Sequence, residues 1–265
     1  MAAITDQLDF TGRTVLVTGG TKGVGRGIAE AFLRVGATVV VTARSEPDEP
    51  IAVDEDGTTG PAAFVAADLR DPEQAAAAVA AATEVGRGRL DCVINNAGGA
   101  PPADAATASA RFSESIVRLN LLAPLHVSQA ANAVMQAQDG GGSIVNIGSV
   151  SGIRPSPGSA VYGAAKAGLV GLTQSLAVEW APKVRLNLIS AGLIRTEQAH
   201  LFYGDEAGIA RVAATVPLGR LAVPADIANA CLFLASPMAG YISGANLVIH
   251  GGGERPAFLD AAEGH

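Results

Sequence analysis

The chain has 265 residues, of which 49% are hydrophobic, and its formal net charge is −7. This length and apolar content suffice for one α/β domain with a large buried core. The acidic balance argues against a nucleic-acid or anionic-membrane surface, because phosphate binding normally shows as clusters of basic residues.

Cysteine content and hydropathy exclude further classes of protein. Cys92 and Cys231 have apolar neighbours and no metal-like spacing, so we expect both to be buried as small hydrophobes and expect no metal site. Residues 1–10 contain two aspartates and no basic residue, unlike a secretory signal, and no apolar stretch reaches the roughly 18 residues of a membrane span. We therefore expect a cytoplasmic protein.

Short β-branched runs alternate with helical patterns along the chain. The strand patterns lie at 14–20, 38–44, 62–69, 90–99, 142–149, 184–190 and 246–252, and the helical patterns lie at 23–36, 71–86, up to 137, 159–177 and from 224. Apolar strands separated by helices are typical of a parallel sheet covered on both faces. We predict a single domain over residues 1–265, a Rossmann-like, doubly wound α/β/α fold with its ligand at the carboxyl ends of the strands. The acidic, proline-containing stretch 45–61 is predicted to be a surface loop.

The turn after the first strand pattern carries glycines suited to phosphate. The sequence TGGTKGVGRG places Gly19, Gly23 and Gly25 ahead of a helix, with Thr21, Lys22 and Val24 between them. Glycines let backbone approach a pyrophosphate, and a helix N-terminus offers unpaired amides and positive dipole to negative charge. Such a turn can be merely structural, but its place after the first strand of an alternating chain favours a dinucleotide site.

The end of the second strand pattern bears on the choice of nicotinamide cofactor. An acid there accepts hydrogen bonds from a ribose 2′-hydroxyl, whereas a cation accommodates a 2′-phosphate. Here Ala43 replaces the acid and Arg44 follows, with Lys22 in the neighbouring turn. Two cations suit a 2′-phosphate, so we favour NADP(H) over NAD(H). The opposing arguments are that Arg44 is simply a solvated residue and that the acids of 46–56 repel a phosphate.

The helical pattern 159–177 contains a tyrosine and a lysine four positions apart. The chain has three tyrosines and three lysines, so chance seldom produces this spacing. Residues at i and i+4 lie on one helix face, so Tyr162 and Lys166 are expected to project into a common space. A free phenol has a pKa of about 10, and a nearby cation lowers it, which would make the phenol a better acid/base near neutral pH.

An ordered set of motifs accompanies this pair. NNAG occupies 95–98, Asn120 lies in RLNLLAP, and Ser149 precedes Tyr162 by 13 residues. With these motifs the chain resembles the short-chain dehydrogenase/reductase family, from about residue 12 to residue 253. The resemblance implies an oxidoreductase that interconverts a carbonyl and a secondary alcohol using NAD(P).

The resemblance also implies catalytic roles. Tyr162 matches the general acid/base, and Lys166 matches the lysine that lowers the pKa of the tyrosine. Both are also expected at the nicotinamide ribose. Ser149 matches the residue that holds the substrate oxygen, and Asn120 matches the residue that holds a water for proton relay. The structural alternatives are that Ser149 caps backbone and that Asn120 satisfies a helix irregularity.

Further positions carry over from the family's cofactor cleft and substrate lid. Asp68 and Leu69 match the segment around the adenine, Asn96, Ala97 and Gly98 match the wall of the cleft, and Ile194 and Thr196 match contacts of the nicotinamide carboxamide. The lid is expected over 193–216, where Leu201, Phe202 and Tyr203 form either an apolar wall or ordinary helix packing. Ala191 replaces the family's usual proline, which puts the order of this lid in doubt.

Two other functions stay open beside the carbonyl and alcohol oxidoreductase. A 3-oxoacyl-(acyl-carrier-protein) reductase would need cations for its acidic partner, and the stretch 135–143 has none. A catalytically silent NADP(H)-binding protein would not need the four catalytic residues. We expect a small-molecule substrate, neither nucleic acid nor membrane as a partner, and a homotetramer with a dimer as the minimum. The small residues of 160–171 and the C-terminal strand near 246–253 would form its contacts.

Overall fold

The computed structural model of the chain describes residues 7–53 and 60–262. Within these ranges seven strands form one sheet in the order β3-β2-β1-β4-β5-β6-β7, and every neighbouring pair is parallel. The strands are β1 (Thr14–Thr18), β2 (Thr38–Ala43), β3 (Ala63–Ala66), β4 (Cys92–Asn95), β5 (Gly142–Ser149), β6 (Val184–Ala191) and β7 (Asn246–Ile249). The predicted doubly wound parallel sheet is confirmed.

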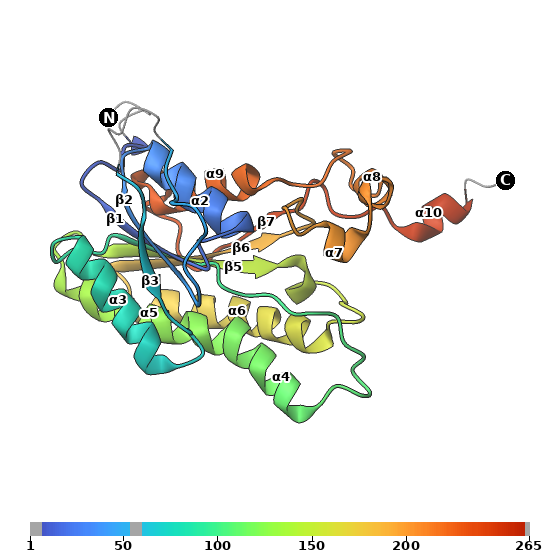
Figure 1. Ribbon diagram of the computed structural model, residues 1–265, viewed down its shortest axis with the longest axis horizontal. Coiled ribbons are helices and arrows are strands. Elements are labelled where there is room, and N and C mark those ends of the chain that lie inside the picture. The colour runs from blue at the N-terminus through green and yellow to red at the C-terminus, as the bar shows by residue number, and fades with distance from the viewer. Residues whose placement is uncertain (1–6, 54–59, 263–265) are drawn as a thin grey trace.

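Helices cover both faces of this sheet. The helices in the described part of the chain are α2 (Gly23–Arg34), α3 (Pro72–Val85), α4 (Ala110–Val117), α5 (Ala123–Ala137), α6 (Ala160–Glu179), α7 (His200–Tyr203), α8 (Glu206–Ala214), α9 (Pro224–Ala235) and α10 (Ala257–Ala262). In Figure 1, α2 and α9 lie on one face of the sheet, and α3, α5 and α6 lie on the other. No helix in the part of the chain that the structure describes is both long and apolar enough to span a bilayer.

The core explains why the strands read as continuous apolar runs. Successive side chains of a strand point to opposite faces, and in β1 Val17 packs into the cluster beneath α2 and α9 while Leu16 packs into the cluster beneath α3 and α5. Both faces are therefore dry. The expected burial of Cys92 and Cys231 is confirmed, and burial raises the pKa of the Cys92 thiol to about 12.

The N-termini of two helices differ in a way that matters for ligand binding. The Asp71 side chain accepts a hydrogen bond from the Glu73 amide at 2.9 Å and so caps α3, which then begins with Pro72. The residue before α2 is Lys22, whose side chain makes no capping bond. The first amides of α2 therefore have no cap from the residue that precedes the helix.

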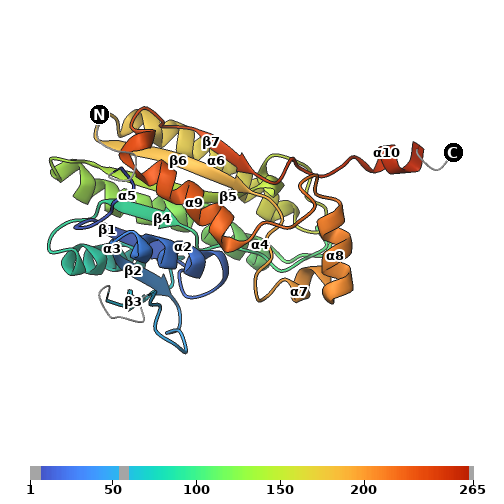
Figure 2. The same ribbon diagram turned by 90° about the horizontal axis from the view of Figure 1, so that it is seen from above.

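Three segments depart from the simplest sequence pattern. A π-helical turn at Arg118–Leu122 separates α4 from α5, where one helical stretch was predicted. The predicted loop at 45–61 has neither helix nor strand in its described residues, and 54–59 lie outside them. The C-terminal residues form α10, which extends away from the body (Figures 1 and 2).

The segment 193–216 has a small apolar core of its own. Ala199, Ile209, Val216 and Leu221 form a buried cluster separate from the two clusters on the sheet, and Tyr203 packs against it. Helices α7 and α8 of this segment lie at the end of the sheet to which β5 and β6 point (Figure 1). Ala191 keeps its pairing with Ile249 at the end of β6, so the sheet is regular up to that residue.

Candidate active site

A large pocket opens where the strand order reverses between β1 and β4. Its volume is about 1150 Å³, above the roughly 300–1,000 Å³ of common small-molecule sites. The carboxyl ends of neighbouring parallel strands meet here, as doubly wound sheets require of a ligand site. The predicted cofactor residues that line it are Gly19, Thr21, Lys22, Gly23, Val24, Gly25, Arg44, Asp68, Leu69, Asn96, Ala97, Gly98 and Thr196. Ile194, Tyr162 and Lys166 are not among its lining residues.

The glycine turn can exist only with glycines. Gly19 and Gly23 have φ values of 62° and 55°, a left-handed region that side chains disfavour. A Cβ on Gly25 would lie 2.1 Å from the carbonyl oxygen of Gly19, so no side chain fits there. The turn is thus folded tightly enough to bring the N-terminus of α2 to the pocket, where its amides suit an anion.

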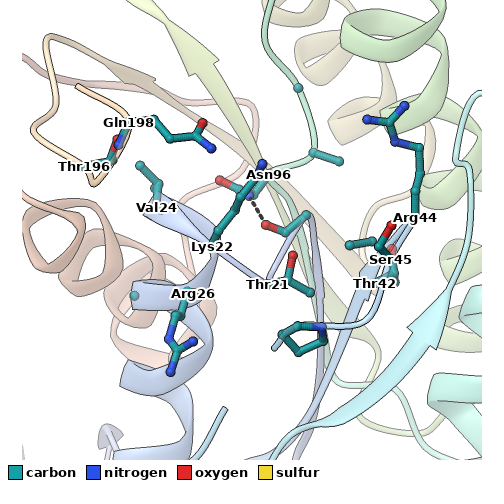
Figure 3. Close-up of a pocket in the computed structure, with 18 of the residues that line it drawn as sticks. Thr21, Lys22, Val24, Arg26, Thr42, Arg44, Ser45, Asn96, Thr196 and Gln198 are labelled. Carbon is teal, nitrogen blue, oxygen red and sulfur yellow. Dashed lines mark hydrogen bonds between the residues drawn. The ribbon is translucent and has the colours of Figure 1, made fainter. Parts of the chain in front are cut away.

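A threonine that the sequence analysis did not single out joins this turn to the next one. Thr18 Oγ1 accepts hydrogen bonds from the amides of Asn96 and Ala97, both at 2.9 Å. In return Asn96 Nδ2 donates to the carbonyl of Gly19 at 3.1 Å (Figure 3). Thr18 is the threonine of the TGG sequence, so the motif that contains it could be recognised from the sequence, whereas its hydrogen-bond partners could not. The two turns form one hydrogen-bonded unit.

Charges of both signs surround the far end of the pocket. Arg44 lies on the side opposite Thr196, with Lys22 between them (Figure 3). Among the described residues, no ion pair engages Lys22 or Arg44. Asp68 pairs instead with Arg70, and that hydrogen bond, more than the nearby charge of Arg44, lowers the pKa of the Asp68 carboxyl.

Part of the acidic stretch does face the same pocket. The acids that line it from this stretch are Glu46, Asp48 and Glu49. Of the acids expected at 46–56 to repel a phosphate, these three are therefore near Arg44, and those at 54–56 lie outside the described residues. The two unpaired cations oppose it.

Tyr162 and Lys166 share one face of α6, as predicted from their spacing. The ammonium nitrogen of Lys166 lies 5.7 Å from the centroid of the Tyr162 ring. Ser149, at the end of β5, is a hydrogen-bonding neighbour that affects the pKa of the phenol, and its Oγ also accepts a hydrogen bond at 3.1 Å from the Ser151 amide, so it caps backbone as well. The expected convergence of these three side chains is thus present in the fold.

The pKa values differ from the expectation. Burial raises the pKa of the Tyr162 phenol, and the hydrogen bond with Ser149 opposes this only in part. We expected Lys166 to lower it. The lysine is only 3% exposed, however, its ammonium donates to the carbonyl of Ile147 at 2.8 Å, and burial lowers its own pKa to about 8. In the isolated chain, desolvation is therefore the largest cause of the pKa shifts of both Tyr162 and Lys166.

Asn120 satisfies the helix irregularity and also lies near the lysine. It is fully buried in the π-helical turn, its Nδ2 donates to the carbonyls of Ile116 and Gly99, and its Oδ1 accepts from the Gly99 amide at 2.8 Å. A Cβ on Gly98 would lie 2.8 Å from Asn120 Oδ1 and 3.2 Å from Lys166 Nζ. Gly98, which lines the pocket, therefore brings the asparagine and the lysine together at its wall.

Tyr203, one of the predicted lid residues, has neighbours that the sequence did not reveal. It is half-buried, and burial, followed by the charges of Glu254 and Tyr162, raises the pKa of its phenol. Glu254 forms an ion pair with Arg154, just beyond β5. Their sequence neighbourhoods carry no motif, so only the fold brings these residues together.

The two interpretations of the aromatic stretch at 201–203, an apolar wall and ordinary helix packing, apply to different residues. Leu201 and Phe202 are 66% and 61% exposed, so neither is packed as an ordinary helix core residue. Tyr203 packs into the small cluster of the segment. The exposed pair leaves an apolar surface on α7.

Comparison with known proteins gives consistent matches over nearly the whole chain. A family profile described as enoyl-(acyl carrier protein) reductase matches residues 19–254. The 3-oxoacyl-(acyl-carrier-protein) reductase of Vibrio cholerae is 36% identical, covering 92% of this chain and 98% of its own.

Two crystal structures are similar in fold and sequence. A short-chain type dehydrogenase/reductase from Mycobacterium marinum has a TM-score of 0.84 at 30% identity, covering 94% of this chain and 98% of its own. A Beutenbergia cavernae protein, provisionally named an NAD(P)-dependent gluconate 5-dehydrogenase, contains NADP at low occupancy. Its TM-score is 0.83 at 34% identity, and the match covers 93% of this chain and 98% of that one.

Proposed function

Since the chain belongs to the short-chain dehydrogenase/reductase family of oxidoreductases, we propose that it interconverts a carbonyl and a secondary alcohol with NADP(H), using Tyr162 as general acid/base. One observation carries the proposal: Tyr162 and Lys166 share one face of α6 beside Ser149, and Lys166 lies against Gly98, which lines the pocket built on the glycine turn. The proposal treats residues 1–265 as one domain and 193–216 as its substrate lid.

The pocket fits a dinucleotide by its shape and its amides. The α2 N-terminus receives no cap from Lys22, and Gly23, Val24 and Gly25 at that end of the helix line the pocket. Its amides would hold the pyrophosphate, Asp68 and Leu69 the adenosine side, and Ile194 and Thr196 the nicotinamide carboxamide. When bound there, the nicotinamide supplies or accepts a hydride.

The preference for NADP(H) rests on cations. Lys22 and Arg44 line the pocket without an ion pair among the described residues, and both can form charge-assisted bonds to a 2′-phosphate. The bound NADP of the Beutenbergia cavernae protein supports the same choice. The facing acids of the stretch 46–49 reduce the expected preference. They are exposed and screened by solvent, as Lys22 and Arg44 are, so the preference rests on the direct bonds that the two cations can form to the phosphate.

The proton chemistry follows from the environments of the two titratable groups. A phenol whose pKa is raised by burial stays protonated, so Tyr162 is suited to donate its proton to a carbonyl oxygen. Ser149, next to the phenol, can donate a hydrogen bond to the same oxygen and hold it in place. Lys166, with its pKa of about 8, can take up or release a proton near neutral pH and so resupply Tyr162. Asn120 is proposed to hold the water that links Lys166 to solvent.

The test is turnover of NADPH, followed by absorbance, across a panel of ketones, quinones and secondary alcohols. The variant Tyr162→Phe should lose about 10²- to 10⁴-fold in kcat, the usual contribution of a general acid/base, while NADPH binding survives. Tyr241→Phe is the matched control, because that side chain is fully exposed. Full activity in Tyr162→Phe would contradict the proposed role.

A second candidate is reduction of 3-oxoacyl groups on acyl carrier protein, which the relative from Vibrio cholerae favours. The absence of cations from 135–143 argues against it. Turnover of the carrier-bound substrate well above that of the matching small thioester would favour this candidate. A catalytically silent NADP(H)-binding protein would show tight cofactor binding and no turnover on the whole panel.

Assembly into a homotetramer, with a dimer as the minimum, is proposed from exposed surfaces. Ala164, Ala167 and Gly171 leave an exposed stripe of small side chains on α6, which permits close helix contact. At the sheet edge, Leu247 and Val248 of β7 are 37% and 38% exposed. Light scattering tests this, and a monomer would contradict it. We propose a cytoplasmic location, a small-molecule substrate, and neither nucleic acid nor membrane as a partner.

A further inference from the structure

A carboxylate from a distant segment bonds to the glycine turn. Glu197 Oε1 accepts a hydrogen bond at 2.9 Å from the amide of Gly23, the first residue of α2. The two residues are 174 positions apart in the chain. Glu197 also lines the large pocket, beside Thr196 and Gln198, whose side chains lie across from Arg44 in Figure 3.

This contact fills a place that suits an anion. The Lys22 side chain does not cap α2, so the Gly23 amide would otherwise be open to the pocket. The positive end of the helix dipole favours a negative charge there. The segment also packs closely, because a Cβ on Gly23 would lie 3.6 Å from Thr196 Cγ2 and 3.7 Å from Glu197 Oε1. The protein thus provides its own anion at the α2 N-terminus.

The pyrophosphate of a dinucleotide needs the same region and carries the same sign of charge. We propose that Glu197 is an internal competitor of the cofactor, which leaves Gly23 when the pyrophosphate binds. The inference rests on the proposed function, since it takes the pocket to be a dinucleotide site. This regulatory role of Glu197 is separate from the acid/base chemistry at Tyr162.

The backbone of Glu197 links this exchange to the lid. The Glu197 carbonyl lies 3.0 Å from His200 Nδ1, and the Ala199 amide donates to the carbonyl of Thr196 at 3.0 Å. Residues 196–200 therefore form one hydrogen-bonded turn that leads into α7. Release of the carboxylate therefore removes a contact between this turn and the glycine turn, while the hydrogen bonds within the turn remain.

The expected size is modest because Glu197 is exposed and its charge is screened. A charge at an exposed helix N-terminus changes an equilibrium by about two- to fivefold, and a charge-assisted hydrogen bond adds to this. When a side chain of the protein occupies its binding site part of the time, the apparent affinity for the ligand falls in proportion to the fraction of molecules whose site is open. Removal of the carboxylate should therefore tighten NADPH binding by about three- to tenfold.

The experiment measures the Kd of NADPH by fluorescence for the wild type, Glu197→Gln and Glu197→Ala. Glu206→Gln is the matched control, because Glu206 is an acid of the same segment whose partner is Arg195 rather than the glycine turn. Hydrogen exchange of the Gly23 amide in the cofactor-free proteins is the second readout. A structural role of Glu197 in general lid stability would not speed exchange at that amide selectively.

The expected result is a lower Kd in both Glu197 variants, an unchanged Kd in Glu206→Gln, and faster exchange at Gly23 in Glu197→Ala. An equal or higher Kd in both Glu197 variants would overturn the inference while leaving the proposed function intact. If Glu206→Gln tightens binding as much as they do, the effect is general charge, and the competitor is likewise refuted. Failure of the wild type to bind NADPH would refute the proposed function, and the inference with it.

Discussion

Replacement of Lys166 by methionine should change how the stability of the protein depends on pH. The lysine is almost fully buried, and burial lowers its pKa from the ordinary value of 10.5 to about 8 in the folded protein. Below pH 8 both the folded and the unfolded chain carry the charge, so the wild type bears the full cost of burying it. Between about pH 8 and 10.5 the folded protein releases a proton that the unfolded chain keeps, and the cost disappears.

The magnitude follows from the shift of the pKa. A difference of about 2.5 units corresponds to about 3 kcal/mol, at about 1.4 kcal/mol per unit. Stability rises with pH wherever the unfolded state binds more protons. The free energy of unfolding of the wild type, relative to Lys166→Met, should therefore increase by about 2 to 3 kcal/mol from pH 7 to pH 10.

Urea unfolding at closely spaced pH values measures this difference. The comparison with Lys166→Met cancels the titration of other groups, and Lys183→Met, at an exposed lysine, controls for the loss of one positive charge. A difference that stays constant from pH 7 to 10 would refute the claim that Lys166 pays a desolvation cost in the fold. It would also remove the physical reason for proton exchange at this lysine near neutral pH.

Three further predictions concern the pocket. Gly25→Ala places a Cβ 2.1 Å from a backbone carbonyl, so it should lower stability by about 1–3 kcal/mol and weaken NADPH binding. Gly140→Ala, with open space around its Cβ position, is the control, and equal effects in calorimetry would contradict the clash. Arg44→Ala should reduce the ratio of kcat/KM for NADPH to that for NADH by about tenfold or more, through loss of a charge-assisted bond; an unchanged ratio would count against Arg44. Thr18→Val removes the acceptor of the Ala97 amide and one of two acceptors of the Asn96 amide, which also donates to the carbonyl of Ile94, and this should cost about 1–3 kcal/mol in denaturant unfolding. A wild-type midpoint there would show that the tie is dispensable.

The features of the fold that could be predicted are those carried by local sequence. Each strand of a doubly covered parallel sheet must be apolar on both faces, and this requirement allowed residues 14–18 and 38–43 to be predicted as strands. The glycine turn could be predicted because only glycine readily adopts the positive φ of Gly19 and permits the close approach at Gly25. The spacing of Tyr162 and Lys166 gave their common face in the same way.

The features that could not be predicted depend on partners distant in sequence. The π-helical turn arises where Asn120 bonds to Gly99, 21 residues away, and no local pattern announces it. The direction of the Tyr162 shift was wrong because spacing alone does not tell how dry a site is. Glu197 on Gly23 and Glu254 on Arg154 are likewise contacts that only the folded chain creates.

The hydrogen bonds between Thr18 and the turn at 96–97 have a consequence for recombination among relatives. Because Asn96 also donates to the carbonyl of Gly19, the two turns can be exchanged separately only with relatives that keep a threonine at position 18 and an asparagine at position 96. A chimera that imports residues 18–25 from a relative without that threonine, but keeps the native 95–98, would deprive the amides of residues 96 and 97 of the Thr18 hydroxyl. Exchange with such a relative must move both stretches together, although they lie some seventy residues apart.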